Sequence, residues 1–269
     1  MRINKKIGFI GCGNMGSAIL KGLVSNKIAG SKQIFIFDSD SSKMNSISKK
    51  YRVQKALNNC DLVRKCQIIL LAVKPQEFSQ VAQEIRFELR PQRIVISILA
   101  GTPLSKIKKN LNSRCQISRA MPNLGALVGE SITAVTSTSN QATSATSAIF
   151  SGCGKVIKLN ERYFDLVTAV SGSGPAYFFL LTELLSQAAQ KGGLSKDLAD
   201  LLAIQTAVGA AHLTKTSTKR PGELCKMVTS KKGTTDAALS YLSKKGFSRI
   251  FIQAVAQAIR RAKQLSKLT

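Results

Sequence analysis

Short runs of apolar residues alternate with segments of helical hydrophobic spacing along the first 160 residues of the chain. Runs that are continuously apolar, rather than alternately apolar and polar, are typical of strands buried on both faces of a parallel sheet. The strands expected on this basis are 7–10, 33–37, 68–73, 93–99, 115–120, 132–136 and 155–159. Helices are expected over 15–25 and, after a short loop, within 137–147. The pattern therefore predicts an α/β domain whose parallel sheet is covered by helices on both faces.

After residue 159 the strand-like runs stop and helical spacing continues. Apolar residues recur at helical spacing over 176–190, a segment followed by Gly192 and Gly193, which are typical of a helix C-terminus. A helix over 196–214 is apolar on most of its circumference, and a helix over 247–265 is amphipathic. We therefore expect two domains, 1–160 and 161–269, and we expect the apolar helices of the second domain to be buried against another subunit.

A glycine-rich turn joins the first expected strand to the first expected helix, with Gly11, Gly13 and Gly16 in the spacing G-x-G-x-x-G. In this context the first glycine allows a tight turn, the second lets the backbone approach a pyrophosphate, and the third lets the helix pack closely on the strand. The N–H groups at the helix start, near Asn14 and Met15, would face the phosphates. The turn predicts a dinucleotide-binding site, and the alternative is a glycine-rich turn in another kind of α/β protein.

Asp38 closes the second expected strand, where an acidic side chain accepts hydrogen bonds from a ribose 2′-hydroxyl and so favours NAD. Ser39, Ser41, Ser42 and Lys43 follow at once, and these residues would instead hold the 2′-phosphate of NADP. Asp38 is equally consistent with a turn residue that points to solvent. The choice between NAD and NADP therefore stays open.

The formal net charge is +26, with +17 in residues 1–160 and +9 in residues 161–269. The basic residues are scattered pairs rather than a block, and no tryptophan and few aromatic residues are present for base stacking, so a nucleic-acid partner is not expected. The chain has one histidine, His212, interpreted as a packed or interface residue, and six widely spaced cysteines, which predict no metal site. We expect these cysteines to be reduced, buried thiols, with Cys12 simply filling space in the glycine turn, and we expect a cytoplasmic location. The longest apolar stretches are interrupted within about a dozen residues, short of the roughly 20 that span a bilayer, so no membrane contact is expected.

Five motifs, in order, resemble those of the pyrroline-5-carboxylate reductase family, and together they cover essentially the whole chain. They are Gly11–Gly16 with Asn14 and Met15; Leu71-Ala72-Val73-Lys74-Pro75-Gln76; Arg119-Ala120-Met121-Pro122-Asn123; Ser171-Gly172-Ser173-Gly174-Pro175-Ala176-Tyr177; and Val228-Thr229-Ser230 followed by Gly233-Thr234-Thr235. The resemblance implies an α/β N-terminal Rossmann-like domain followed by an all-α C-terminal dimerisation domain. It also implies reduction of 1-pyrroline-5-carboxylate to L-proline, the last step of proline biosynthesis, with NADPH or NADH as cofactor and a homodimer or a higher homo-oligomer as the assembly.

The resemblance also assigns roles to residues by their place in the matching motifs. Asn59 would lie near the adenosine ribose, and two segments would lie near the nicotinamide half: Ala72, Val73, Lys74 and Pro75, and Met121, Pro122 and Asn123. Ser230, Gly233, Thr234 and Thr235 would hold the substrate carboxylate in a loop, with Thr235 nearest the ring nitrogen as the catalytic residue. Because a protonated imine is already electrophilic, no dedicated acid is needed, and the protein contributes orientation and electrostatics.

The sequence departs from the family pattern at two places. Lys231 and Lys232 replace the usual Pro-Gly of the carboxylate loop, which removes one fixed and one permissive backbone position. Leu124 and Gly125 replace the usual Thr-Pro after Asn123, which predicts a looser turn. Two alternatives to the proline-forming reaction follow: reduction of a related cyclic imine acid, and a paralogue without catalysis that binds a cofactor or a polyanion.

Overall fold

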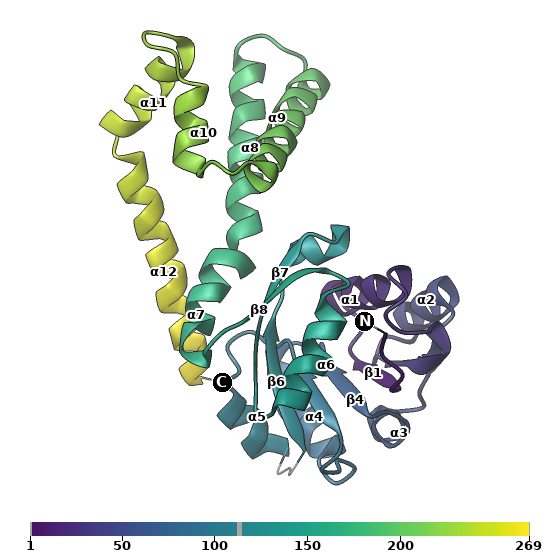
Figure 1. Ribbon diagram of the computed structural model, residues 1–269. Helices are drawn as coiled ribbons and strands as arrows, with labels where there is room; N and C mark the ends of the chain where they lie inside the picture. Colours follow the sequence, from purple (N-terminus) through teal and green to yellow (C-terminus); the bar gives the residue numbers. More distant parts are fainter. Residues whose placement is uncertain (1, 112–114, 269) are drawn as a thin grey trace. The chain divides into compact units, whose positions relative to one another are not determined.

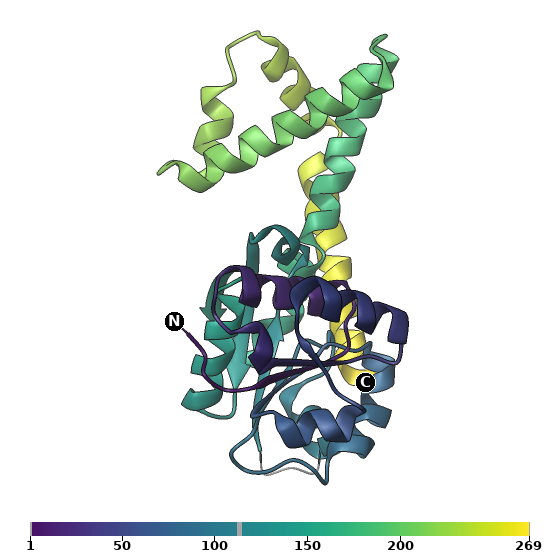
Figure 2. The same ribbon diagram turned by 90° about the vertical axis from the view of Figure 1, so that its right-hand side faces the viewer.

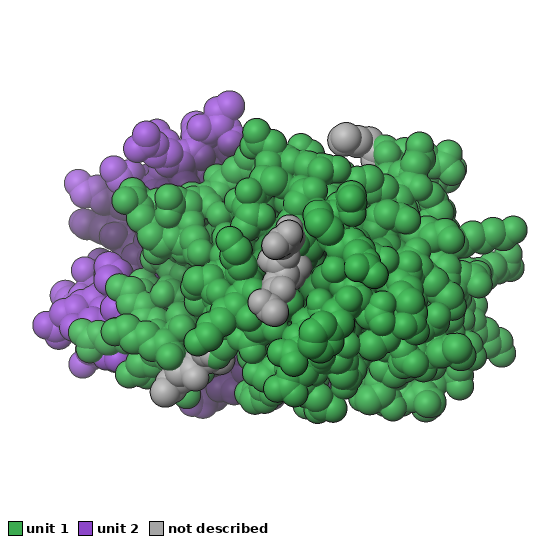
Figure 3. Space-filling view, turned by 90° about the horizontal axis from the view of Figure 1, so that it is seen from below, with its two compact units in different colours: residues 1–173, 258–269 green, residues 174–257 purple. Residues whose placement is uncertain are grey.

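The computed structural model describes residues 2–111 and 115–268, without the side chain of Leu268 (Figure 1). Its internal contacts divide the chain into two compact units, coloured green and purple in Figure 3. Unit 1 comprises Met1–Ser173 with Ala258–Thr269, and unit 2 comprises Gly174–Gln257.

Unit 1 is built on one eight-stranded sheet. Its strands are β1 (Ile7–Ile10), β2 (Ile34–Phe37), β3 (Gln54–Lys55), β4 (Ile68–Leu71), β5 (Ile94–Ser97), β6 (Gln116–Met121), β7 (Ser131–Ser137) and β8 (Gly154–Lys158). The spatial order is β3-β2-β1-β4-β5-β6-β7-β8, and its first six strands have the order of a dinucleotide-binding sheet. All seven strands expected from the apolar runs are present within a few residues of their predicted bounds.

Two details of the sheet differ from the prediction. The sheet is not wholly parallel, because β6 and β7 pair antiparallel. Only residues 122–130 connect them, which is shorter than the dozen or more residues that a parallel crossover needs. The chain then returns through a helix, so β8 lies parallel to β7. The sequence pattern also missed β3, because its two residues are polar and exposed.

Helices cover both faces of the sheet, as Figure 2 shows with α1 and α2 on one side and the blue helices on the other. On one face, α1 (Asn14–Ser25), α2 (Ser41–Tyr51) and α6 (Asn140–Phe150) enclose a core with the first residue set of each strand, such as Phe9 and Ile36. On the other face, α3 (Asn59–Lys65), α4 (Phe78–Ile85) and α5 (Leu104–Leu111) pack on the alternate set, such as Ile69 and Val95. Burial on both faces explains why the strands are continuously apolar.

Short helical turns and one further segment complete unit 1. The 3₁₀ turns are η1 (Ser31–Gln33), η2 (Pro75–Glu77), η3 (Leu124–Val128) and η4 (Glu161–Tyr163). Unit 1 also contains α7 (Phe164–Val167), the π-helical turn η5 (Thr168–Gly172) and the end of α12 (Phe247–Leu268). The earlier part of α12 belongs to unit 2.

Unit 2 is entirely helical in its described residues, and its helices leave large apolar side chains exposed. It contains α8 (Gly174–Lys191), α9 (Lys196–Thr216), α10 (Pro221–Met227), α11 (Thr234–Lys244) and the first part of α12. Phe178, Leu201 and Ile252 are 71%, 62% and 69% exposed. The buried residues of α9 are Ala199 and Ala203. The single chain therefore does not cover this helix, and an apolar surface of this kind is typical of a subunit interface.

Two expectations need correction for the single chain, and the expectation of no membrane contact stays a prediction. His212 is exposed rather than packed within the chain, which leaves the interface interpretation. The six cysteines form no disulfide among the described residues, but Cys225 is exposed and Cys60 is half-buried, so these two are not the buried thiols expected. The helical stretch Glu161–Lys191 is long and apolar enough, by length and composition only, to cross a membrane. The core helix of a soluble protein has the same length and composition.

Candidate active site

A cavity of about 620 Å³ lies at the carboxyl ends of β1, β2 and β4, where strand order reverses around β1. This edge is where open α/β sheets bind their ligands. Its wall is formed by Ile10, Gly11, Gly13, Phe37, Asp38, Ser39, Asp40, Lys43, Asn58, Asn59, Ala72, Val73, Lys74, Glu77, Gln80, Val81 and Glu84. Eight of the residues assigned to the cofactor from sequence therefore share one wall.

The three glycines of the turn have three different constraints. Gly11 has φ +94°, and a Cβ on it would lie 2.6 Å from the carbonyl oxygen of Ala72. A Cβ on Gly16 would lie 2.7 Å from the carbonyl oxygen of Gly11, so the third glycine is required for packing of α1. A Cβ on Gly13 would meet no atom within 4 Å, because this residue faces free space in the cavity. The turn thus leaves room for a phosphate group in front of the first N–H groups of α1, and this chain's residues fit a dinucleotide.

Asp38 joins the glycine turn to the end of β2. Its Oδ2 accepts a hydrogen bond from the Cys12 N–H at 2.6 Å, and its Oδ1 accepts one from the Asp40 N–H at 2.9 Å. The carboxylate is half-buried and turns toward the protein, so the interpretation as a residue pointing to solvent is wrong. Burial and then the Asp38 charge raise the pKa of the Cys12 thiol to about 12. The thiol therefore stays protonated and, at 3% exposure, fills space.

The cavity wall beside Asp38 carries groups that suit a phosphate. Asp40 caps α2 by accepting the Lys43 N–H at 3.0 Å, and the Lys43 ammonium lies 3.8 Å from the Asp40 carboxylate. Both side chains of this ion pair are about half exposed, and such pairs are weak. Lys43 and Ser39 are therefore available to an anionic ligand.

The cavity wall contributed by η2 and α4 was not predicted from the sequence. Glu77, Gln80, Val81 and Glu84 face the cavity. Their spacing of i, i+3, i+4 and i+7 puts them on one helical face, but a face that meets solvent has the same spacing, so the sequence carried no signal that separates the two. Glu84 accepts a hydrogen bond from the Asn59 amide at 2.6 Å, and Asn59 is 6% exposed. The Oδ1 atom of Asn59 is buried without a hydrogen-bond partner in the part of the chain that the structure describes.

The other residues assigned to the cofactor do not line this cavity. Asn14 and Met15 begin α1, and Met15 packs against the core. Pro75 begins η2, and Met121, Pro122 and Asn123 follow one another at the end of β6. The Asn123 side chain accepts the Gly125 N–H at 3.2 Å, and the Glu130 N–H donates to the Gly125 carbonyl at 2.9 Å. The expectation of a loose turn after Asn123 is wrong, because these bonds hold a 3₁₀ turn.

The residues assigned to the substrate lie in unit 2. The Gly233 N–H donates to the Ser230 carbonyl at 2.9 Å, which closes a tight turn through Lys231 and Lys232. Lys232 takes φ +60°, the conformation that the family's usual glycine adopts at no cost, and its N–H donates to Asp236 at 3.0 Å. Thr234 and Thr235 are the first residues of α11 rather than part of a loop.

The chain is similar to known proteins over nearly its whole length. Residues 161–265 match the family model for pyrroline-5-carboxylate reductase dimerisation, and residues 6–101 match the model described as NADP oxidoreductase, coenzyme F420-dependent. The pyrroline-5-carboxylate reductases of Methanosarcina acetivorans and Synechocystis are 36% and 38% identical to this chain over 267 residues. These alignments cover 98% and 97% of this chain and 99% and 98% of the relatives.

Two solved structures are similar over nearly the whole chain. The pyrroline-5-carboxylate reductase of Coxiella burnetii has a TM-score of 0.91 at 32% identity and covers 98% of this chain and 99% of its own. The pyrroline carboxylate reductase of Plasmodium falciparum, solved with NADP bound, has a TM-score of 0.88 at 31% identity and covers 99% of this chain and all of its own. Relatives of this identity and coverage establish that the chain belongs to the pyrroline-5-carboxylate reductase family.

Proposed function

We propose that this protein reduces 1-pyrroline-5-carboxylate to L-proline with NADPH or NADH. The observation that carries the proposal is the cavity at the ends of β1, β2 and β4, with its free space in front of Gly13, in a chain that matches such reductases end to end. Reduction of a related cyclic imine acid and loss of catalysis are not favoured by these relatives.

The cofactor half of the proposal rests on residues of unit 1. Gly11, Gly13 and the N-terminus of α1 hold the pyrophosphate, Asn59 lies at the adenosine ribose, and Ser39 with Lys43 receives a 2′-phosphate when NADPH is used. Val73, Lys74 and the segment 121–123 lie at the nicotinamide. When bound, the nicotinamide supplies the hydride that reduces the imine carbon.

The substrate half rests on the turn and helix start in unit 2. Beside Gly233, the N-cap of α11, Ser230, Thr234 and Thr235 offer hydroxyls, and the positive end of the helix attracts a carboxylate. Thr235 is half-buried and is proposed to contact the ring nitrogen. These groups act by orienting a substrate that is already electrophilic when protonated.

We also propose a homodimer, or a higher homo-oligomer built on dimers, that covers the exposed apolar helices of unit 2. The match of residues 161–265 to a dimerisation family supports it. In such an assembly, a second subunit rather than a membrane covers the apolar side chains of the helical stretch Glu161–Lys191. Free cysteines throughout the described chain are consistent with a cytoplasmic location.

The test is oxidation of NADPH and of NADH by the purified protein with pyrroline-5-carboxylate, then with the six-membered analogue. Faster turnover of the five-membered ring is expected, and no turnover with either ring would refute the proposal. Thr235→Ala and Gly233→Val should lower activity while the fold stays intact, whereas Ser243→Ala, on an exposed residue at the other end of α11, should not. Full activity in both site variants would refute the placement of the substrate.

A further inference from the structure

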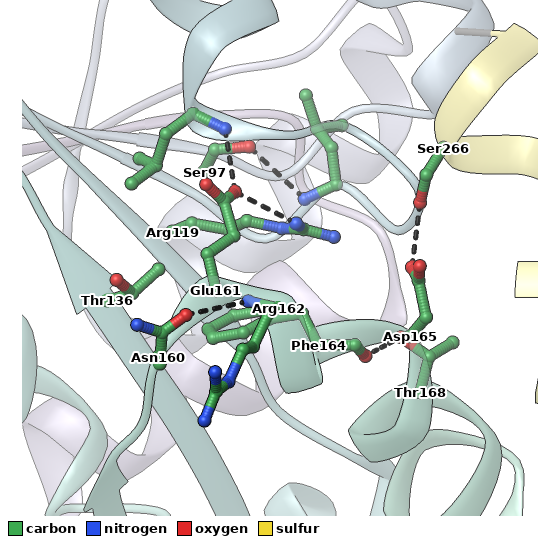
Figure 4. A network of polar contacts seen from close by, with 12 residues as sticks. Ser97, Arg119, Thr136, Asn160, Glu161, Arg162, Phe164, Asp165, Thr168 and Ser266 are labelled. Atoms are coloured by element: carbon green, nitrogen blue, oxygen red, sulfur yellow. Dashed lines mark hydrogen bonds and ion pairs between the residues drawn. The ribbon is translucent and has the colours of Figure 1, made fainter. Parts of the chain in front are cut away.

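A buried cation outside the cavity has no part in the function described so far. Arg119, on β6, is 3% exposed. Figure 4 shows its guanidinium beside Glu161, with Nη1 at 3.0 Å from the Oε1 atom of that carboxylate. The guanidinium carbon lies 4.7 Å from the centroid of the Phe164 ring, and Phe164 is itself fully buried. Two contacts of one side chain thus join β6 to η4 and α7.

The surroundings of Arg119 do not require a charge for packing alone. Its neighbours on the same face of the sheet are uncharged: Ile117 belongs to the core shared with α5, and the residues paired with Arg119 on β5 and β7 are Ser97 and Thr136. Taking a charged group out of water is costly, and a well-packed apolar side chain is commonly as stable as a buried ion pair. The Nη2 atom of Arg119 is buried without a hydrogen-bond partner among residues 2–111 and 115–268, so the site is not optimised for stability. A charged residue here points to a positional role.

Glu161 and the residues after it are held in place by further hydrogen bonds. The carboxylate Oε1 that pairs with Arg119 also accepts the Leu104 N–H at 2.8 Å, at the first residue of α5. Further along the same segment, Ser266 of α12 donates a hydrogen bond to Asp165 at 2.7 Å (Figure 4). The segment 161–172 is therefore held at several points against the sheet and α5.

This held segment contacts the residue that follows Arg119 on its own face of β6. Side chains two apart on a strand point to the same side, so Arg119 and Met121 share a face. A Cβ on Gly172, the last residue of η5, would lie 2.7 Å from the Cε of Met121, so the Met121 side chain occupies the space that this glycine leaves open. The position of the end of β6 thus depends on where the segment 161–172 is held.

We propose that Arg119 is a positioning residue for the reduction: through Glu161 and Phe164 it fixes the segment 161–172, and thereby Met121, Pro122 and Asn123. The inference rests on the proposed function, in which residues 121–123 lie at the nicotinamide half of the cofactor. The adenosine and pyrophosphate half binds in the cavity at β1, β2 and β4, to which Arg119 does not contribute. Loss of Arg119 should therefore affect the reacting half of the cofactor and spare the other half.

The test compares Arg119→Met with wild type in the full-length protein, at a temperature well below the midpoint of thermal unfolding of each. We expect kcat to fall about 10- to 100-fold, the loss expected for a displacement of about 1 Å at the reacting centre. The inhibition constants of ADP-ribose and 2′-phospho-ADP-ribose, which fill only the cavity, should stay within about twofold. The isotope effect with cofactor deuterated at the transferred position should rise, because transfer becomes slower than product release. Arg119→Lys should recover part of kcat.

Arg93→Met is the matched control, because Arg93 precedes the amino end of β5 and donates to the carbonyls of Arg64, Cys66 and Glu88, away from residues 121–123 at the carboxyl end of β6. It should change thermal stability without changing kcat or the isotope effect. The proposal is overturned if Arg119→Met keeps wild-type kcat, or if its kcat and its affinity for the ADP-ribose probes fall together, as a general loosening of unit 1 would cause. Failure of the proposed function looks different, because wild type would then reduce no pyrroline-5-carboxylate.

Discussion

The three glycines of the turn after β1 should give separable effects when each is replaced by alanine. Gly13→Ala adds a methyl group in the free space of the cavity, where no atom lies within 4 Å. Gly11→Ala adds the same group 2.6 Å from a backbone oxygen, at a residue with φ +94°. The first change should therefore damage cofactor binding, and the second should damage the fold.

The expected magnitudes follow from these positions. Gly13 is the N-cap of α1 with φ −64° and ψ −175°, which alanine adopts freely. Alanine is a poorer N-cap than glycine, but it reduces the entropy of the unfolded chain by about 0.4–1 kcal/mol, so the net change in unfolding free energy is about zero. Displacing a phosphate from one charge-assisted hydrogen bond costs about 1.5–3 kcal/mol, which raises the dissociation constant about 10- to 150-fold. For Gly11→Ala, the positive φ alone costs about 1–3 kcal/mol, and the close contact adds to it.

The assays are cofactor titration by fluorescence and calorimetric unfolding at one fixed protein concentration, because the unfolding midpoint of an oligomer depends on concentration. Gly13→Ala should bind NADPH and NADH weakly and unfold within about 2 °C of wild type. Gly11→Ala should unfold at least about 4 °C lower, at roughly 2–4 °C per kcal/mol for a chain of this size. Wild-type affinity in Gly13→Ala would show that the pyrophosphate does not bind in front of α1, and unchanged stability in Gly11→Ala would refute the strain argument.

Four further results are expected. Lys43→Gln should raise KM for NADPH several-fold and leave KM for NADH nearly unchanged, because only NADPH carries the 2′-phosphate that Lys43 would pair with. Equal changes in the two KM values would show that Lys43 does not bind the 2′-phosphate. Lys232→Gly should raise the free energy of unfolding in denaturant by up to about 1 kcal/mol. Relief of the left-handed lysine contributes about 1–2 kcal/mol, and the greater conformational entropy of glycine in the unfolded chain offsets about half of it. A decrease in the free energy of unfolding would contradict the turn geometry. A thiol reagent should label exposed Cys225 long before buried Cys12. The free energy of unfolding should fall as the pH rises from about 9 towards 12, because the unfolded chain releases the thiol protons of Cys12 and Cys66 that the folded chain retains.

The sequence predicted the sheet well because its physical signal is local. Residues such as Ile68 and Val95 lie in strands buried on both faces, so each strand is recognisable from a continuous apolar run. The antiparallel pairing of β6 with β7 was not predictable from apolar content, because direction depends on the length of the connection. The strand β3 has no apolar signal, since Gln54 and Lys55 are both exposed.

The candidate site was predicted in part, for a similar reason. Gly11, Gly13 and Asp38 belong to a turn whose spacing is itself the signal, so they were found before the fold was known. Glu77 and Glu84 were missed because a polar helix face has the same composition whether it meets solvent or a cavity. The role of Arg119 depends on Glu161, which is 42 residues away in the sequence, and no local pattern reports such a pair.

The excess of basic residues makes the few acidic residues informative. The chain has 40 lysines and arginines but only 14 aspartates and glutamates, and four of those acidic residues, Asp38, Asp40, Glu77 and Glu84, line one cavity. Each of the four accepts a hydrogen bond that shapes the wall: from the glycine turn, from the start of α2, from the Lys74 N–H at 3.2 Å, and from the Asn59 amide. Lysines that attract a dinucleotide through the overall field act at long range and are interchangeable, whereas a carboxylate that accepts a particular N–H is not. The net charge of +26 therefore identifies no site by itself, whereas the four carboxylates of the cavity each hold one particular donor of its wall.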